Sequence, residues 1–220
     1  MKRLILILLI FLAITLVFYQ NDKTTKQITG SATGTSYISF RILSDCNIFL
    51  GEGWNLISIC SNMTNKTIEA ALKDITGEYR YVLEWNESNQ KFSVFSPLAV
   101  ENPFTELSEN KSYFVYLFSL NGSINPGGKK FEDVEIPLVL GWNSPIYPYE
   151  FETDILKYLK SINNSYKYVM VWNASEQRFL IFSAYSAIND FRNISSGEGQ
   201  FIYISNASGA ILKYNRSELG

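Results

Sequence analysis

An eighteen-residue segment occurs twice in this chain of 220 residues, and no other feature constrains the fold as strongly. Residues 79–96 read YRYVLEWNESNQKFSVFS and residues 166–183 read YKYVMVWNASEQRFLIFS, so ten of the eighteen positions are identical. Two unrelated segments of average composition would share about one position. The chain therefore contains a duplicated structural unit, which indicates a tandem repeat.

The residues before each copy predict a strand and then a helix. Gly-Trp-Asn, at 53–55 and again at 141–143, opens a strand after a glycine turn. Next, apolar residues recur at positions i, i+3, i+4 and i+7, first from residue 68 to 75 and then from 155 to 162. This spacing predicts one helix in each copy, and Thr67 and Asp154 are placed to cap them.

The duplicated segment itself predicts a hairpin. Aromatic and aliphatic residues alternate along 79–85, polar residues fill 86–89, and a return strand follows through Phe95. With a last strand near 113–118, and near 201–204 in the second copy, each unit is β-α-β-β-β with mostly antiparallel sheets. We therefore predict an α+β fold of two homologous modules, in which one helix covers one face of each sheet.

These motifs resemble the tandem Gly-Trp-Asn repeats of secreted archaeal and bacterial cell-surface proteins of the S-layer-associated type. The likeness covers about residues 50 to 205, and the stalk-like segment Ile28–Gly34 is similar to that of exported archaeal proteins. Two departures stand out: Ser144-Pro145 replaces the usual Leu-Ile/Val, and the closing Gly-Tyr-Trp is missing from both copies. The resemblance implies a surface role without catalytic activity.

The N-terminus predicts one transmembrane or signal helix ahead of the modules. Residues 4–19 are apolar apart from Thr15 and follow Lys2 and Arg3, a pattern typical of a secretory signal or of a signal anchor. The small-residue cleavage candidate, residues 30–32, lies far beyond the apolar run and favours an uncleaved anchor. In both interpretations the chain after residue 20 faces outward.

The predicted domains follow from these segments. We expect a signal anchor or signal peptide at 1–20, a flexible Thr/Gly/Ser-rich stalk at 21–36, module 1 at 37–124 and module 2 at 129–215.

Asn-x-Ser/Thr acceptors are far more frequent than chance, since about three would be expected from composition. Their excess predicts an N-glycosylated, extracellular chain. The alternative is a chain rich in Asn-Ser turns. The ten predicted glycosylation sites are Asn62, Asn65, Asn86, Asn110, Asn121, Asn163, Asn173, Asn193, Asn206 and Asn215.

Cysteine and histidine usage bounds the chemistry. The chain has no histidine, which excludes Ser-His and Cys-His hydrolases and most haem and zinc sites. Cys46 and Cys60 flank a Gly-Glu-Gly turn, so a hairpin there would place them on facing strands and predicts a disulfide. Against the disulfide, the positions that align in copy two are Val134 and Pro148.

Charge excludes one class of partner and leaves one metal alternative. A net charge of −2 without a basic run makes nucleic acid an unsuitable partner. Glu150, Glu152 and Asp154 alternate and could hold calcium, but a solvated strand that runs into an acidic helix cap explains them equally well. We predict no metal and no cofactor.

Aromatic residues offer the remaining candidate site. The tryptophans are expected to anchor the core, and the alternative is a ligand platform in which a ring beside Asn and Gln stacks on a sugar. Tyr147, Tyr149 and Tyr185 occur in copy two alone and are the candidates for an exposed ligand-contact patch. The four tryptophans are Trp54, Trp85, Trp142 and Trp172.

These features together predict a non-catalytic extracellular protein of the cell surface, serving in envelope structure or adhesion. Its expected partners are the membrane, through residues 4–19, and cell-envelope polymers or surface proteins. The expected location is the cell membrane, in a single pass with the N-terminus inside and the modules outside, or the secreted fraction. The alternative is a carbohydrate- or protein-binding receptor domain. A glycosidase using paired carboxylates, such as Glu84 and Glu101, is the least favoured.

Overall fold

A computed structural model describes residues 46–219, without the side chains of residues 119 and 120. The predicted N-terminal helix, the stalk and the first residues of module 1 lie outside the described residues. Between residues 46 and 219, no helix is long and apolar enough to cross a membrane.

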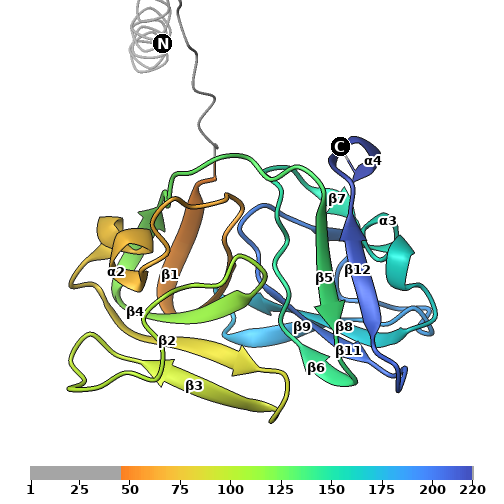
Figure 1. The fold of residues 1–220 in the computed structure, drawn as a ribbon, viewed down its shortest axis with the longest axis horizontal. Helices are drawn as coiled ribbons and strands as arrows, with labels where there is room; N and C mark the ends of the chain where they lie inside the picture. Colours follow the sequence, from red (N-terminus) through yellow and green to blue (C-terminus); the bar gives the residue numbers. More distant parts are fainter. Residues whose placement is uncertain (1–45, 220) are drawn as a thin grey trace, which may run out of the picture. The chain divides into compact units, whose positions relative to one another are not determined.

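Module 1 is built on one four-stranded antiparallel sheet with the strand order β1-β4-β2-β3 (Figure 1). Its elements are β1 (Ile48–Ser58), α2 (Ile68–Ala71), the 3₁₀ turn η1 (Lys73–Ile75), β2 (Tyr79–Asn86), β3 (Lys91–Phe95) and β4 (Ser112–Ile124). The long pair β1–β4 has a bulge between Gly51 and Gly53.

Module 2 repeats this arrangement with the order β6-β11-β8-β9. The equivalent of the β1–β4 pair is interrupted, so its outer half forms a separate β5–β12 ribbon, and β7 pairs with β10. The elements are β5 (Val134–Leu138), β6 (Gly141–Asn143), β7 (Thr153–Asp154), α3 (Ile155–Tyr158), η2 (Lys160–Ile162), β8 (Tyr166–Asn173), β9 (Arg178–Phe182), β10 (Asn193–Ile194), β11 (Gln200–Ile204), β12 (Ala210–Tyr214) and α4 (Arg216–Leu219).

The structure corrects the predicted α+β class. The described residues form mostly antiparallel β-sheets, and no α-helix among them exceeds four residues. The periodic stripe in each copy does face the core, and Thr67 and Asp154 do cap α2 and α3. However, one α-helical turn followed by one 3₁₀ turn satisfies the same spacing, and the chain then enters β2 or β8 directly. The helical segments are therefore short connections rather than a layer.

The predicted hairpin is confirmed in both copies. Strand β2 pairs with β3 from Val82 to Asn86, and β8 pairs with β9 in the corresponding register. Trp85 faces Phe92, and Trp172 faces Phe179, at equivalent places. The duplicated sequence thus produces a duplicated element.

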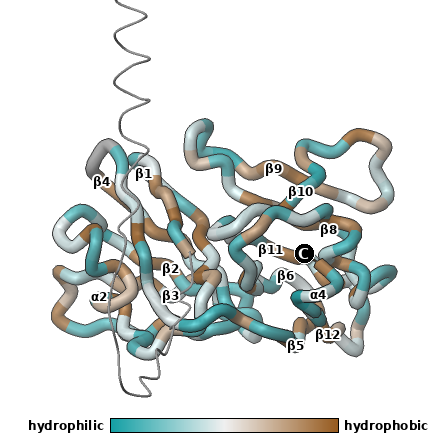
Figure 2. Tube along the Cα trace, turned by 90° about the horizontal axis from the view of Figure 1, so that it is seen from above, coloured by the Kyte–Doolittle hydropathy of each residue, from teal (hydrophilic) through white to brown (hydrophobic). Residues whose placement is uncertain are grey.

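Each module packs its helical segment against one face of its own sheet. The cluster in module 1 includes Ile68, Leu72 and Val115, and the cluster in module 2 has their counterparts. Along the tube in Figure 2, hydrophobic residues lie mainly in the strands and hydrophilic residues in the connections. Burial of these apolar faces, at about 25 cal/mol per Å², is the main stabilising contribution to each module.

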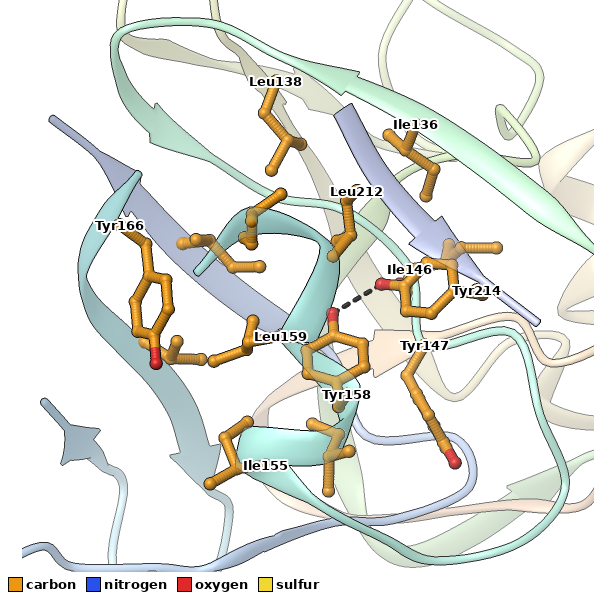
Figure 3. Packing of buried hydrophobic residues seen from close by; sticks show 14 of the residues in the cluster. Ile136, Leu138, Ile146, Tyr147, Ile155, Tyr158, Leu159, Tyr166, Leu212 and Tyr214 are labelled. Atoms are coloured by element: carbon orange, nitrogen blue, oxygen red, sulfur yellow. Dashed lines mark hydrogen bonds between the residues drawn. The ribbon is translucent and has the colours of Figure 1, made fainter. Parts of the chain in front are cut away.

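The core of module 2 also contains a tyrosine pair. The hydroxyls of Tyr158 and Tyr214 are hydrogen-bonded at 2.5 Å, as the dashed line in Figure 3 shows, and Tyr214 in turn donates to the carbonyl of Ile146 at 2.6 Å. Burial raises the pKa of both phenols. These hydroxyls satisfy one another inside the core, which removes the cost of burying them unpaired.

Candidate functional site

The free face of each sheet carries the aromatic residues that the repeat preserves, and these two faces meet. Phe114 and Phe201 lie at the centre of the contact with ring centroids 6.2 Å apart. Phe114 packs edge-on against Trp172 at 5.4 Å, and Phe201 packs edge-on against Trp85 at 5.7 Å. Each contact therefore has a counterpart with the modules exchanged, as in a two-fold symmetric dimer interface. We call this contact the module interface.

The tryptophan indoles bond across the module interface in the same reciprocal way. Trp85 donates from Nε1 to the backbone carbonyl of Trp142 at 2.9 Å. Trp172 donates from Nε1 to the backbone carbonyl of Trp54 at 2.7 Å. All four side chains are half-buried. The tryptophans therefore pack against a hydrophobic core cluster, as expected of core anchors, but this cluster lies between the two modules.

Two glutamines clamp the same backbone positions. Gln90 accepts from the N–H of Trp142 at 2.9 Å and donates to its carbonyl at 3.0 Å, so its amide imitates a neighbouring strand. Gln177 does the same to Trp54 at 2.9 and 3.0 Å. Both glutamines have positive φ, of 54° and 51°, which is uncommon for a residue with a side chain. Each hairpin turn therefore keeps the same positive-φ conformation at the glutamine that binds the other module.

Each residue of Gly-Trp-Asn serves this contact. Gly53 has φ of 89°, and a Cβ built on it would lie 2.8 Å from Oε1 of Gln177. The middle residue, Trp54, offers the backbone groups that the glutamine binds. The buried side chain of Asn55 bonds the N–H and C=O of Gly51 at 2.8 Å each, and so fixes the bulge. The motif therefore shapes a docking edge rather than a catalytic site.

Two short stretches of backbone complete the module interface. Ile57 forms a bridge with Glu198, and Lys111 forms the matching bridge with Pro145. The hydrogen bonds run from Ser58 to Gly197 at 2.9 Å, from Gly199 to Leu56 at 3.0 Å, from Ser112 to Ser144 at 2.7 Å and from Ile146 to Asn110 at 3.2 Å. Since backbone pairing fixes both distance and direction, the two modules are held as one unit.

All ten predicted glycosylation sites lie outside the cores. The side chains of Asn86, Asn173 and Asn215 are half-buried and the other seven asparagines are exposed. Nine of the ten have no hydrogen bond from the amide nitrogen to another described residue, whereas Asn193 donates from Nδ2 to Glu152. The glycan would be attached at this nitrogen, so the geometry leaves nine sites open to modification.

Half of these Asn-x-Ser/Thr motifs also form a local turn. In five of the ten, the asparagine Oδ1 accepts from the N–H two residues on, which is an Asx turn. The five are Asn65, Asn86, Asn173, Asn206 and Asn215. The Asn-Ser turn alternative thus accounts for five positions and leaves the other five unexplained by local structure.

The predicted disulfide is present. Cys46 and Cys60 are joined, with a Cα–Cα distance of 5.4 Å, and both are buried. The bond ties the segment before β1 to the end of β1. It belongs to module 1 alone, as the alignment with Val134 and Pro148 requires.

The proposed tyrosine patch is wrong for two of its three members. Tyr147 and Tyr149 are fully buried, and their hydroxyls donate to the carbonyls of Phe151 and Glu132, both at 2.9 Å. Burial raises the pKa of Tyr149 to about 12. Only Tyr185 is exposed, at 75%. The segment that carries the first two crosses the core of module 2, which a period-2 pattern of tyrosines does not reveal.

The acidic cluster serves structure. Glu150 accepts from Lys130 at 2.7 Å and from Arg216 at 2.6 Å, and the hydrogen bond from Arg216 is the main reason that its pKa falls to about 2. Asp154 caps α3. Within residues 46–219 no three acidic or cysteine side chains are grouped closely enough to hold a metal ion.

The carboxylates named for glycosidase chemistry are also accounted for in part. Glu84 and Glu87 both pair with Lys111 at 3.0 Å. Desolvation by burial would lower the pKa of Lys111, but the hydrogen bonds to these two carboxylates outweigh it, and the pKa is raised. Glu84 is thus neutralised by Lys111, which also donates to the carbonyl of Trp85 at 3.0 Å.

Three aromatic side chains in each module remain outward beside the module interface. In module 1, Trp54, Tyr116 and Tyr81 stand opposite one another on three adjacent strands. The ring of Tyr116 lies 5.0 Å from Trp54 and 6.2 Å from Tyr81. Module 2 places Trp142, Tyr203 and Tyr168 in the same register, with distances of 5.1 and 6.4 Å. We call these two sets the aromatic triads.

Comparison with known proteins finds no match: no family profile, no curated protein and no solved structure is similar to this chain.

Proposed function

We propose that this chain is a non-catalytic protein of the cell surface, whose two glycosylated modules act as one rigid unit in envelope structure or adhesion. The observation that carries the proposal is the position of the Asn-x-Ser/Thr motifs. All ten asparagines lie outside both cores, whereas most of the apolar residues in the two modules are buried. A chain can carry many glycans only in this arrangement.

Two further observations support an exported chain. The disulfide between Cys46 and Cys60 is typical of an oxidising environment outside the cytosol. The linker, residues 125–128 between the two modules, is held in place, because Asn62 and Lys129 form a bridge beside it. Modules held together by backbone pairing, one of them closed by a disulfide, resist proteolysis, which a protein exposed outside the cell needs.

The proposal is tested on protein purified from intact source cells that have first been treated with an impermeant biotin reagent. Glycopeptide mass spectrometry then maps the ten asparagines. We expect biotinylated protein with several sites modified and Asn193 unmodified, since its amide nitrogen is bound to Glu152. Recovery of unlabelled protein with all ten asparagines unmodified and with reduced cysteines would refute the proposal.

A carbohydrate- or protein-binding receptor is the second candidate function. The observation that favours it is the pair of aromatic triads, which stay partly exposed in both modules. The two functions are compatible, because adhesion to an envelope polymer requires a binding surface.

A further inference from the structure

The aromatic triads contain tyrosines that the two modules share and that lie at the surface of each sheet. Tyr81 and Tyr116 lie outside the three buried clusters, as do their counterparts Tyr168 and Tyr203. Tyr81 is 37% exposed and Tyr168 is 45% exposed. The buried aromatic residues common to both copies are explained by the cores and by the module interface. These tyrosines pack on the tryptophan or on each other within their triad and stay partly exposed in both modules, so they form an equivalent surface on which a ligand can lie.

The phenol hydroxyls of the triads are available for bonding. No hydrogen bond joins the hydroxyl of any of these four tyrosines to another described residue, whereas core tyrosines such as Tyr113 and Tyr147 use theirs on backbone groups. Each triad therefore offers apolar ring faces with donor and acceptor groups at their edges. Such a surface combines packing with orientation-fixing polar groups.

The charge of the triads limits the class of ligand. All six members are neutral. The side chains of the triads therefore offer a ligand no fixed charge, which favours a ligand that is neutral, rich in hydroxyl groups and able to pack C–H bonds on the negative face of an aromatic ring. Sugar rings have all three properties.

We propose that the two aromatic triads are equivalent binding sites for the sugar rings of a neutral glycan. A pyranose ring lies against Tyr81 and Tyr116 in module 1, or against Tyr168 and Tyr203 in module 2, and its hydroxyls bond the free phenols. Because the module interface fixes the two sites relative to each other, a polymer with repeating sugars engages both. Such bivalent binding exceeds the affinity of one site by about 10² to 10⁴ where the geometry permits it.

This inference rests on the proposed function and names a ligand class for it. Only the source of the glycan depends on the location of the protein at the cell surface. It is tested with the purified chain and a panel of neutral polysaccharides: glucan, mannan, galactan and chitin, with their short oligosaccharides. We expect saturable binding to at least one polymer and two sites per chain for its oligosaccharide by calorimetry. Absence of binding to every member of the panel overturns the proposal.

Variants locate the binding sites. Tyr81→Ala should halve the number of oligosaccharide sites and weaken polymer binding at least tenfold, and Tyr81→Ala/Tyr168→Ala should abolish both. The Phe variants at these two positions keep the ring and should lose part of the affinity without loss of folding. Tyr185→Ala is the matched control, because Tyr185 is exposed outside the triads. Unchanged binding in the double variant, or competition by a proline-rich peptide or choline in place of sugar, overturns the assignment.

The two failures are distinguishable. Loss of the glycan result in purified protein leaves the surface labelling and glycopeptide map unaffected. Conversely, an unlabelled and unmodified chain refutes the surface role even where the purified protein binds sugar.

Discussion

Replacing Trp85 with alanine tests how the two modules are held together. Trp85 makes edge-to-face contacts with Phe92 at 4.8 Å and with Phe201 at 5.7 Å, and donates to Trp142 at 2.9 Å. Two aromatic pairs contribute about 1 to 3 kcal/mol together, and the hydrogen bond adds about 0.5 to 1.5 kcal/mol. We therefore expect Trp85→Ala to lower the free energy of unfolding by about 1.5 to 4.5 kcal/mol.

The assay is equilibrium unfolding in urea, followed by far-ultraviolet circular dichroism, with Trp172→Ala as the matched variant. Trp172 has equivalent contacts with Phe179 at 4.9 Å and Phe114 at 5.4 Å, so its loss should cost a similar amount. A double-mutant cycle of Trp85 with Phe201 should give a coupling energy of about 0.5 to 1.5 kcal/mol across the interface. Zero coupling, or a large loss in one variant beside a neutral result in the other, would refute the reciprocal contact.

Three further predictions concern single features of the modules. Reduction of the Cys46–Cys60 disulfide, whose sequence separation is 14, should lower the free energy of unfolding by about 3 kcal/mol in urea titrations; an unchanged midpoint contradicts this. Asn55→Ala leaves three backbone groups at the bulge without their partner and should cost about 1 to 3 kcal/mol by thermal unfolding. The pKa of Glu150 is lowered in the folded state to about 2, from an ordinary value of 4.5, so its stabilising contribution is present above pH 4.5 and is lost as the pH falls toward 2. Glu150→Gln should lack that part of the acid dependence, and a slope equal to that of the unmodified chain refutes it.

Local features were largely predictable from sequence. The hairpin followed from large apolar residues at every second position of 79–85 and a polar turn, both of which depend on neighbouring residues alone. The caps at Thr67 and Asp154 followed for the same reason. The disulfide was predicted from a hairpin turn midway between the two cysteines, but that stretch is a bulge within the continuous strand β1, so the pairing was right and its reason was wrong. The helical stripe was read correctly, but its length was not, since α and 3₁₀ turns share that spacing.

The module interface could not be predicted, because its partners are far apart along the chain. Gln177 binds the backbone of Trp54, 123 residues away, and no periodicity reports such a contact. The repeat does preserve Gln90 and Gln177 in exposed turns. Each also donates to a carbonyl of its own turn, so their retention alone does not reveal the contact with the other module.

Cleavage of the linker tests the central claim, that the residues shared by the two copies join the modules into one unit. A protease site is inserted between Asn125 and Pro126, and the cut chain is examined by native mass spectrometry. We predict a single species that contains both halves, and its dissociation when Trp85→Ala and Trp172→Ala are combined. Two separate, folded halves from the cut chain with both tryptophans intact would contradict the claim.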